Sequence, residues 1–514
     1  MSFLLDDICQ NFINRGIVSV GDTIKGSDRS KICNNIVESV YESFVAKISS
    51  YNFASIINIA YVSLEKLIPE IVLRTNNYKN QIHLYAKKEK EIREMLSEYS
   101  ASSVSLRFIL EYVGAIQHEG KLKCDIIDLE DLMAYVKTIL DWATASDAFM
   151  YDMIDDEIKI LESKRFGYNK ENIENLQNYL SSTQFDYLSK EKKDNSFSIS
   201  ILEKNNIFMK DYGYDFEQYI SIIKLLFEYG DTISSEVKTI NIDKWIKLCD
   251  AKNVPKILYN VIDDFSIEKR DDYFKYKYYM TREFYPWRFN RLFSLFRRPL
   301  IRVNDKYYYG NRNLIHNIYY ISKLIDEGIF NSGKRGKNYS IKYNGVIAEK
   351  RGKLFNEEVA RVFETFTSME TYQNVVSINS KHISDEEGND LGDIDVLSIS
   401  KNLRKIYVVE VKDYSLAKNF NDLSIEIKKL FEGTEDSKPD YEKHINRFTW
   451  VLNHKDDIIK EYKLNGTNWQ IIPLFITNQP MVSHKYKKFK NINLIDIGDL
   501  NYNYLKNLKT IKLK

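Results

Sequence analysis

Residues 405–414, KIYVVEVKDY, constrain the fold more than any other stretch of this 514-residue chain. Val, Ile and Tyr favour β-strands, and successive side chains of a strand point to opposite faces of the sheet. The pattern predicts a buried strand with Val409 and Val411 on one face and Glu410 and Lys412 on the other. Because an uncompensated buried charge is costly, these two charged side chains need partners elsewhere in the fold.

A second predicted strand carries acids in the same way. In GDIDVL, residues 392–397, Asp393 and Asp395 share one face of the strand. If the two strands are neighbours, both present carboxylates to one side of the sheet. Either a salt bridge with Lys412 or a divalent cation compensates such carboxylates. Magnesium prefers one or two carboxylates, with water and phosphate oxygens completing its shell, and it prepares a bound water to attack a phosphodiester.

The order of predicted elements indicates one α/β domain over residues 345–514, with a mixed sheet and flanking helices. A helix in RGKLFNEEVARVFETF comes first, followed by strands in YQNVVSI, DIDVLSI and KIYVVEV. A helix in YEKHINRFTWVLNH and strands in WQIIPLFIT and INLIDIG complete the domain.

This ordered set resembles the PD-(D/E)xK, or restriction-endonuclease-like, nuclease superfamily. The resemblance covers about residues 345–500 and lies in an acid of the first helix, an Asp at the second strand and E-x-K on the third. It implies that Asp395, Glu410 and Glu357 bind Mg²⁺, with Mn²⁺ able to substitute. It also implies that Lys412 assists the attacking water.

The sequence departs from the superfamily pattern at two places. Gly392 stands where the proline of the pattern is expected, and two aspartates follow it. We favour Asp395, because relatives with a G-x-hydrophobic-D form use the third residue after the glycine, and we keep Asp393 as the reserve. Glu357 is favoured over the adjoining Glu358, because the apolar residues after it then form a packing face.

The predicted helix at 441–454 adds three polar candidates within about one turn. Lys443, His444 and Arg447 are expected to contact the substrate backbone or the scissile phosphate. For His444 alone, a structural or surface role is the favoured alternative.

Residues 1–255 predict a mostly helical domain, which makes the whole chain an α+β or α/β multidomain protein. Apolar residues repeat every four positions at Ile36, Val40, Phe44 and Ile48, as on the buried face of a helix. Asp128 is a candidate N-cap for a helix that follows it. By analogy with helical domains joined to such nucleases, we expect a recognition, regulatory or partner-binding role.

Residues 256–344 form a connecting region rich in arginine and aromatic residues. From Thr281 to Arg351 the chain carries 15 Lys or Arg and 5 Asp or Glu, although its overall net charge is +1. Such a region favours nucleic-acid binding through phosphate neutralisation and base stacking. The favoured alternative is an amphipathic helix that buries its aromatics. The candidate nucleic-acid contacts are Arg288, Arg291, Arg297, Arg298, Lys334, Arg335 and Lys337.

The remaining composition narrows the class of protein. The four cysteines form no CxxC and the histidines lack finger spacing, so neither a disulfide framework nor structural zinc is expected. An acidic N-terminus and the absence of long apolar runs predict a cytoplasmic protein without membrane contact.

These features predict a Mg²⁺-dependent DNA endonuclease of a restriction or anti-phage defence type, with DNA favoured over RNA. The alternatives are an inactive nucleic-acid-binding module of nuclease fold and an RNA-directed nuclease controlled by the helical half. A homodimer or defence-system partner proteins are possible assemblies.

Overall fold

The structure is a computed structural model, and the chain divides into two compact units. One unit, here the helical unit, comprises Met1–Asn178 and Ser196–Gly345; the other, the sheet unit, comprises Tyr179–Asn195 and Val346–Lys514. The structure describes residues 2–81, 89–118, 120–169, 171–177, 180, 197–288, 291–366, 369–435, 437–483 and 493–511. Among them, no helix has the length and apolar character needed to cross a membrane.

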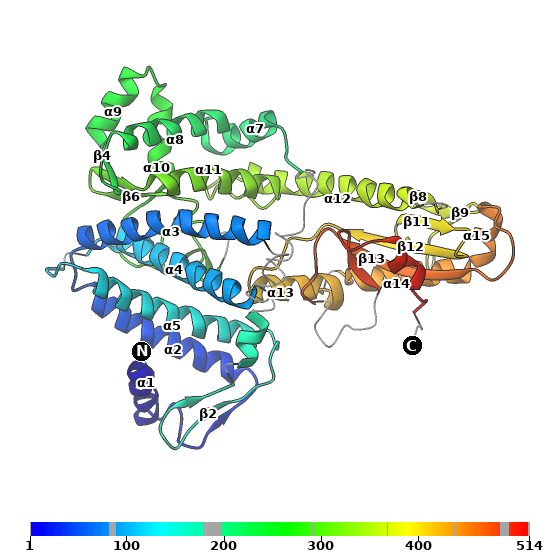
Figure 1. The fold of residues 1–514 in the computed structure, drawn as a ribbon, viewed down its shortest axis with the longest axis horizontal. Coiled ribbons are helices and arrows are strands. Elements are labelled where there is room, and N and C mark those ends of the chain that lie inside the picture. The colour runs from blue at the N-terminus through cyan, green and yellow to red at the C-terminus, as the bar shows by residue number, and fades with distance from the viewer. Residues whose placement is uncertain are drawn as a thin grey trace. The chain divides into compact units, whose positions relative to one another are not determined.

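Long helices build the first part of the helical unit (Figure 1). They are α1 (Ser2–Asn14), α2 (Asp28–Ile48), α3 (Phe53–Gln81), α4 (Glu89–Ile116) and α5 (Ile126–Met150). The four-residue apolar repeat of α2 is fully buried, so the predicted stripe is confirmed. The N-cap prediction at Asp128 is wrong: Asp125 caps α5, and Asp128 is the third helical residue of the same capping box.

The rest of the helical unit combines shorter helices with two small sheets. The helices are α7 (Ile201–Tyr212), α8 (Phe216–Asp231), α9 (Ile242–Ala251), α10 (Val261–Asp264), α11 (Asn311–Asp326) and the 3₁₀ segments Lys256–Asn260 and Thr281–Phe284. One sheet has the order β4-β7-β6-β5 and the other β1-β2-β3. Their strands are β1 (Thr23–Ile24), β2 (Ile158–Ile160), β3 (Phe166–Gly167), β4 (Lys238–Asn241), β5 (Ser266–Ile267), β6 (Leu300–Val303) and β7 (Lys306–Tyr309).

The sheet unit has a mixed sheet of order β14-β13-β12-β11-β8, flanked by helices (Figure 1). Strands β8 (Met369–Val375), β11 (Ile394–Ser400) and β12 (Lys405–Lys412) pair antiparallel, whereas β12, β13 (Gln470–Thr477) and β14 (Leu494–Asp496) pair parallel. The helices are α12 (Tyr339–Thr365), α13 (Phe420–Ile427), α14 (Asp440–Asn453), α15 (Lys455–Glu461) and α16 (Tyr502–Asn507), with a π-helical segment at Lys428–Glu432. A short hairpin joins β9 (Ser377–Ile378) and β10 (Lys381–His382).

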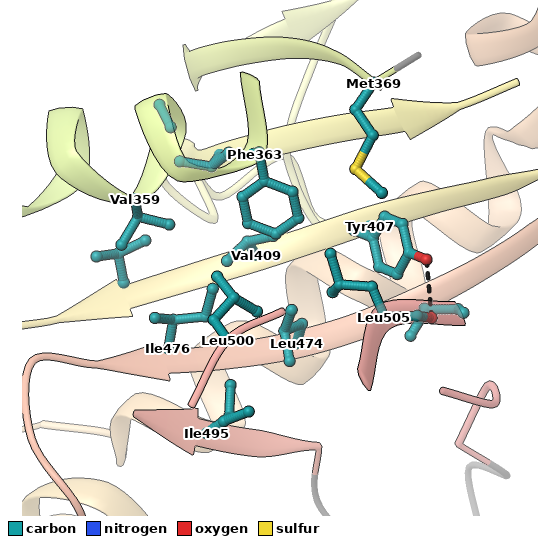
Figure 2. Packing of buried hydrophobic residues seen from close by; sticks show 14 of the residues in the cluster. Val359, Phe363, Met369, Tyr407, Val409, Leu474, Ile476, Ile495, Leu500 and Leu505 are labelled. Carbon is teal, nitrogen blue, oxygen red and sulfur yellow. Dashed lines mark hydrogen bonds between the residues drawn. The ribbon is translucent and has the colours of Figure 1, made fainter. Parts of the chain in front are cut away.

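Alternation along β12 separates two apolar cores. Figure 2 shows one core, in which Val359 and Phe363 of α12 lie against Tyr407 and Val409 of β12, with Leu505 of α16 beside them. The other face, which includes Ile406 and Val408, packs against apolar side chains of α14 and α15. Each face of the central strand is therefore covered by helix.

One charged residue of β12 has a purely structural role. Lys405 is buried, and its Nζ donates to the carbonyl oxygens of Lys506 at 2.6 Å and Leu508 at 2.7 Å. These carbonyls belong to the end of α16 and the residue after it, where backbone acceptors lack helical partners. Lys405 thus ties the start of β12 to the C-terminal end of α16.

The predicted fold class is confirmed: the first half is mostly helical, and an α+β arrangement with a mixed sheet follows. Each strand predicted after residue 369 is present within a few residues of its expected bounds. Helices α13, α15 and α16, the π-helical segment and the β9–β10 hairpin were not predicted.

Candidate active site

The antiparallel register of β11 and β12 brings the predicted acids together. Val396 pairs with Val409, so Asp395 and Glu410 are the next positions along the two strands. The backbone N–H of Val411 donates to Asp395 Oδ2 over 2.7 Å. This bond fixes the aspartate against the strand that carries the glutamate.

Glu410 is the most buried of the charged side chains in this cluster, with 1% of its surface exposed. Its Oε1 lies 2.7 Å from Lys412 Nζ, and its Oε2 lies 2.8 Å from a terminal nitrogen of Arg447. Two cations therefore compensate one carboxylate. Lys412 Nζ also lies 3.8 Å from Asp395 Oδ2, so the lysine lies between both acids.

Helix α14 supplies the other side of the cluster. His444 and Arg447 are three residues apart, which places them on the same face of a helix, and both are buried. His444 Nδ1 lies 3.7 Å from Glu410 Oε2, and its ring meets Phe475 edge to face. Arg447 Nη1 donates to the carbonyl oxygen of Asp393 over 2.7 Å.

The main chain before β11 adapts to Arg447. Gly392 has a φ of 80°, in the left-handed region that favours glycine. A Cβ at this position would lie 3.4 Å from Arg447 Nη1. The glycine found in place of the expected proline therefore permits both the turn and the close approach of the guanidinium.

Burial dominates the electrostatics of the cluster. It raises the pKa of Glu410 to about 7, with Lys412 and Arg447 opposing the shift. Burial also raises the pKa of Asp395. For His444, burial and then the two cations lower the pKa to about 3, so the imidazole is neutral. Burial alone would lower the pKa of Lys412, but Glu410 and Asp395 outweigh it and raise that pKa.

The carboxylates of the remaining predicted acids form none of the ion pairs described above. Asp393 takes part through its carbonyl oxygen. Glu357 and Glu358 are half-buried on α12, the helix that packs on the face of the sheet opposite to Glu410. No contact of Glu357 with Asp395 or Glu410 is found in the described part of the chain.

Arg291 and Arg297 of the connecting region point into the helical unit. Arg291 is buried and forms a two-pronged ion pair with Glu111 at 2.5 and 3.0 Å. Arg297 is buried and donates to the carbonyl of Asn331. This corrects the expectation that these two arginines face phosphate, because both guanidinium groups are used inside the fold.

Arg288 and Arg298 are also engaged within the helical unit. Arg288 lies 3.4 Å from Asp147. Arg298 lies over the ring of Phe293 and donates to the carbonyls of Ser266 and Leu292. The alternative weighed for this region was an amphipathic helix with its aromatics inward and its arginines along the rim. Among the described residues no such helix is present, and Arg291 and Arg297 are buried.

The basic loop after α11 is more accessible. Arg335 and Lys337 are exposed, whereas Lys334 is paired with Asp264. On α14, Lys443 is also partly exposed and lies 3.4 Å from Asp440. Arg335, Lys337 and Lys443 are therefore the predicted phosphate contacts that remain reachable from solvent.

Two polar residues directly after β12 were not predicted as part of the site. Tyr414 donates to Asp440 over 2.6 Å, and Asp413 is paired with Arg351 at 2.8 Å. Both follow Lys412 directly in the sequence, but their partners lie in α14 and α12. The polar run KDY at the end of the strand indicated that polar side chains gather there. The sequence alone did not indicate Asp440 and Arg351 as their partners.

A comparison with protein-family models decides the affiliation of the chain. The model of the family described as "Anti-phage protein Upx-like" matches residues 84–501, which is more than half of the chain. The chain belongs to the Upx-like anti-phage protein family. No curated protein and no solved structure gives a match. The matched range includes the whole Asp395–Arg447 cluster.

The donor set in this Upx-like protein restricts which metal it suits. Within the described ranges, no group of three or more His, Cys, Asp or Glu is close enough to hold a metal ion. Asp395 and Glu410 are two carboxylates from adjacent strands, and magnesium commonly uses one or two protein carboxylates with water and phosphate. Both oxygens of Glu410 are engaged, Oε1 by Lys412 and Oε2 by Arg447, so a metal ion would compete with these two cations for the carboxylate.

Proposed function

We propose that this Upx-like protein is a metal-dependent nuclease that hydrolyses phosphodiester bonds as part of anti-phage defence. The observation that carries the proposal is the convergence of Asp395, Glu410 and Lys412 from two adjacent strands. This is the acid–acid–lysine set of the PD-(D/E)xK pattern. Ion pairs within the cluster bring the three side chains into one site despite the cost of burying them.

Each residue has a distinct role in the proposed reaction. Asp395 and Glu410 hold Mg²⁺ or Mn²⁺, and a bound ion supplies a Lewis acid and an activated water. Lys412 lies between both acids, so its ammonium group is positioned to orient the water or to offset charge on the phosphoryl oxygens. Neutral His444 and charged Arg447 line the same site from α14.

DNA is the proposed substrate, with RNA as the alternative. The proposal rests on the superfamily pattern and on the reachable cations of the loop after α11 and of α14. The helical unit is proposed to recognise substrate, bind a partner or regulate cleavage. A homodimer or partner proteins would supply a second site where both strands are cut.

Cleavage assays with the full chain test the proposal. Single-stranded DNA, duplex DNA and RNA are incubated with Mg²⁺ or Mn²⁺, beside Asp395→Asn and Lys412→Met. We expect cleavage that needs the metal and is lost in both variants. Lys401→Met, which removes an exposed cation paired with Glu370, is the control and should retain activity. Full activity in the two site variants would refute the assignment of the site.

A second candidate is a nucleic-acid-binding protein that does not cut. It is favoured by the pairing of Glu410 with both Lys412 and Arg447, which compensates the buried carboxylate without any metal. Calorimetric titration with Mn²⁺ separates the candidates. No heat of binding, with or without DNA, together with retained DNA affinity would favour the second.

A further inference from the structure

Arg447 of α14 contacts both β12 and the residue just before β11 in the candidate site. One terminal nitrogen lies 2.8 Å from Glu410 Oε2 on β12, and the other donates to the Asp393 carbonyl before β11. Its side chain is 8% exposed. The guanidinium thus occupies an oxygen of Glu410 that a metal ion would otherwise reach.

The four groups in direct contact balance one another when both carboxylates are ionised. Asp395 and Glu410 then carry two negative charges, Lys412 and Arg447 carry two positive ones, and Asp393 and Asp440 add more distant negative charge. A divalent cation placed on the carboxylates would meet two like charges in a buried setting, where repulsion is weakly screened. Binding a metal alone is therefore opposed, and Arg447 contributes to this opposition by direct contact.

A phosphate group changes this balance. Arginine binds phosphate oxygens through the planar fork that it uses for carboxylates, so a backbone phosphate is a second partner for the same guanidinium. Arg447 Nε is a buried donor with no hydrogen-bond partner in the described part of the chain. His444 Nε2 also lacks a partner there, and it donates in the tautomer that carries the proton on that nitrogen. Buried polar groups are normally satisfied, and an incoming phosphate offers them acceptor oxygens.

We propose that Arg447 makes metal binding depend on nucleic-acid binding. In the free protein Arg447 holds Glu410; when nucleic acid binds, a backbone phosphate draws the guanidinium away and leaves the carboxylate available to the metal. The inference rests on the proposed nuclease function. It implies that each ligand tightens the binding of the other by the same factor, because such coupling is reciprocal at equilibrium.

The test measures Mn²⁺ affinity by calorimetry on the full chain. Mn²⁺ is titrated into the protein alone and into protein saturated with a short single-stranded DNA of uncleaved phosphorothioate linkages. We expect the oligonucleotide to tighten Mn²⁺ binding by about 5- to 150-fold, the usual range of such couplings. In the converse titration, oligonucleotide is added to the native protein in the presence and absence of Mn²⁺. Mn²⁺ should tighten oligonucleotide binding by the same factor.

Arg447→Met separates this role from a structural one. We expect the variant to bind Mn²⁺ more tightly than the native protein when DNA is absent, and to lose most of the coupling. Merely losing a structural contact would weaken metal binding. Lys401→Met removes an exposed cation of the same unit and should leave both values unchanged. Arg447→Lys keeps the charge without the fork and should retain part of the coupling, which provides the test if the methionine variant does not fold.

The outcomes distinguish the two proposals. Two results would overturn the role of Arg447 and leave the nuclease proposal standing. One is metal-dependent cleavage without coupling between Mn²⁺ and DNA binding. The other is an unchanged Mn²⁺ affinity, measured without DNA, in a folded Arg447→Met variant. Absence of both Mn²⁺ binding and cleavage overturns the two together.

Discussion

The stability of the sheet unit should fall as pH rises through neutrality, because of Glu426 on α13. This side chain is 5% exposed and accepts a hydrogen bond from the Ser483 N–H at 2.8 Å. No Lys or Arg forms an ion pair with it in the part of the chain that the structure describes. Burial is the main cause that raises the pKa of Glu426 from 4.5 to about 7.

The magnitude follows from these two values. Each unit of difference in pKa between folded and unfolded protein corresponds to about 1.4 kcal/mol, so ionised Glu426 costs about 3 kcal/mol of folding stability. Because the folded pKa is the higher one, the folded protein binds more protons between pH 4.5 and about 7. Stability from this group is complete below pH 4.5 and is lost as pH rises through 7.

Glu426→Gln should remove the part of this dependence that Glu426 contributes and leave the part that comes from Glu410, whose pKa burial also raises to about 7. The variant should match the native protein near pH 4.5 and exceed its free energy of unfolding by about 3 kcal/mol at pH 8.5. Hydrogen exchange of peptides from β12 and β13, measured against denaturant, reports this free energy for the sheet unit. Glu432→Gln, at an exposed position on the π-helical segment, is the matched control and should not alter the pH profile. An equal gain at both pH values, or none, would refute the reasoning.

Three further substitutions test how the fold supports the site. Gly345→Ala in α12 should raise helix stability by about 0.5–1 kcal/mol, since a Cβ there has nothing within 4 Å; a lower melting temperature would contradict this. Lys405→Met should lower the free energy of unfolding by about 1–3 kcal/mol, because it strands the buried carbonyls at the end of α16, and denaturant titration against Lys401→Met measures it. Gly392→Ala should cost about 1–2 kcal/mol through its φ of 80° and should also reduce cleavage, whereas an unchanged melting temperature would argue against strain at this turn.

The strands that carry the cluster were predictable because their signal is local. Period-two alternation in KIYVVEVK and DIDVLSI indicates which side chains share a face. These two strands follow each other in the sequence, so the simplest expectation is that they pair. The shared location of Asp395, Glu410 and Lys412 follows from that pattern alone. The preference for Asp395 over Asp393 as a metal ligand stays a prediction; in the structure the Asp395 carboxylate lies near Lys412, and Asp393 contributes its carbonyl.

The remaining contacts depend on packing that no local pattern encodes. Arg447 reaches Glu410 because α14 covers one particular face of the sheet, and Glu357 lies away from it because α12 covers the other. Arg291 looked like a phosphate contact, yet its partner Glu111 lies 180 residues earlier. A run of aromatics and arginines has the same composition whether it faces solvent or the interior. Only the position of a distant acid distinguishes the exposed case from the buried one.

Strand β12 is bonded to a neighbour along both edges and covered by helices on both faces. Local opening of a protein occurs where backbone hydrogen bonds are exposed and packing is sparse. Neither condition holds at either edge of this strand. The groups proposed for chemistry therefore share the lifetime of the sheet unit itself, and they cannot be disabled by a brief fraying of the backbone around them. Any regulation of Glu410 therefore has to act through the side chains that contact it, or by limiting which ligands can reach the site.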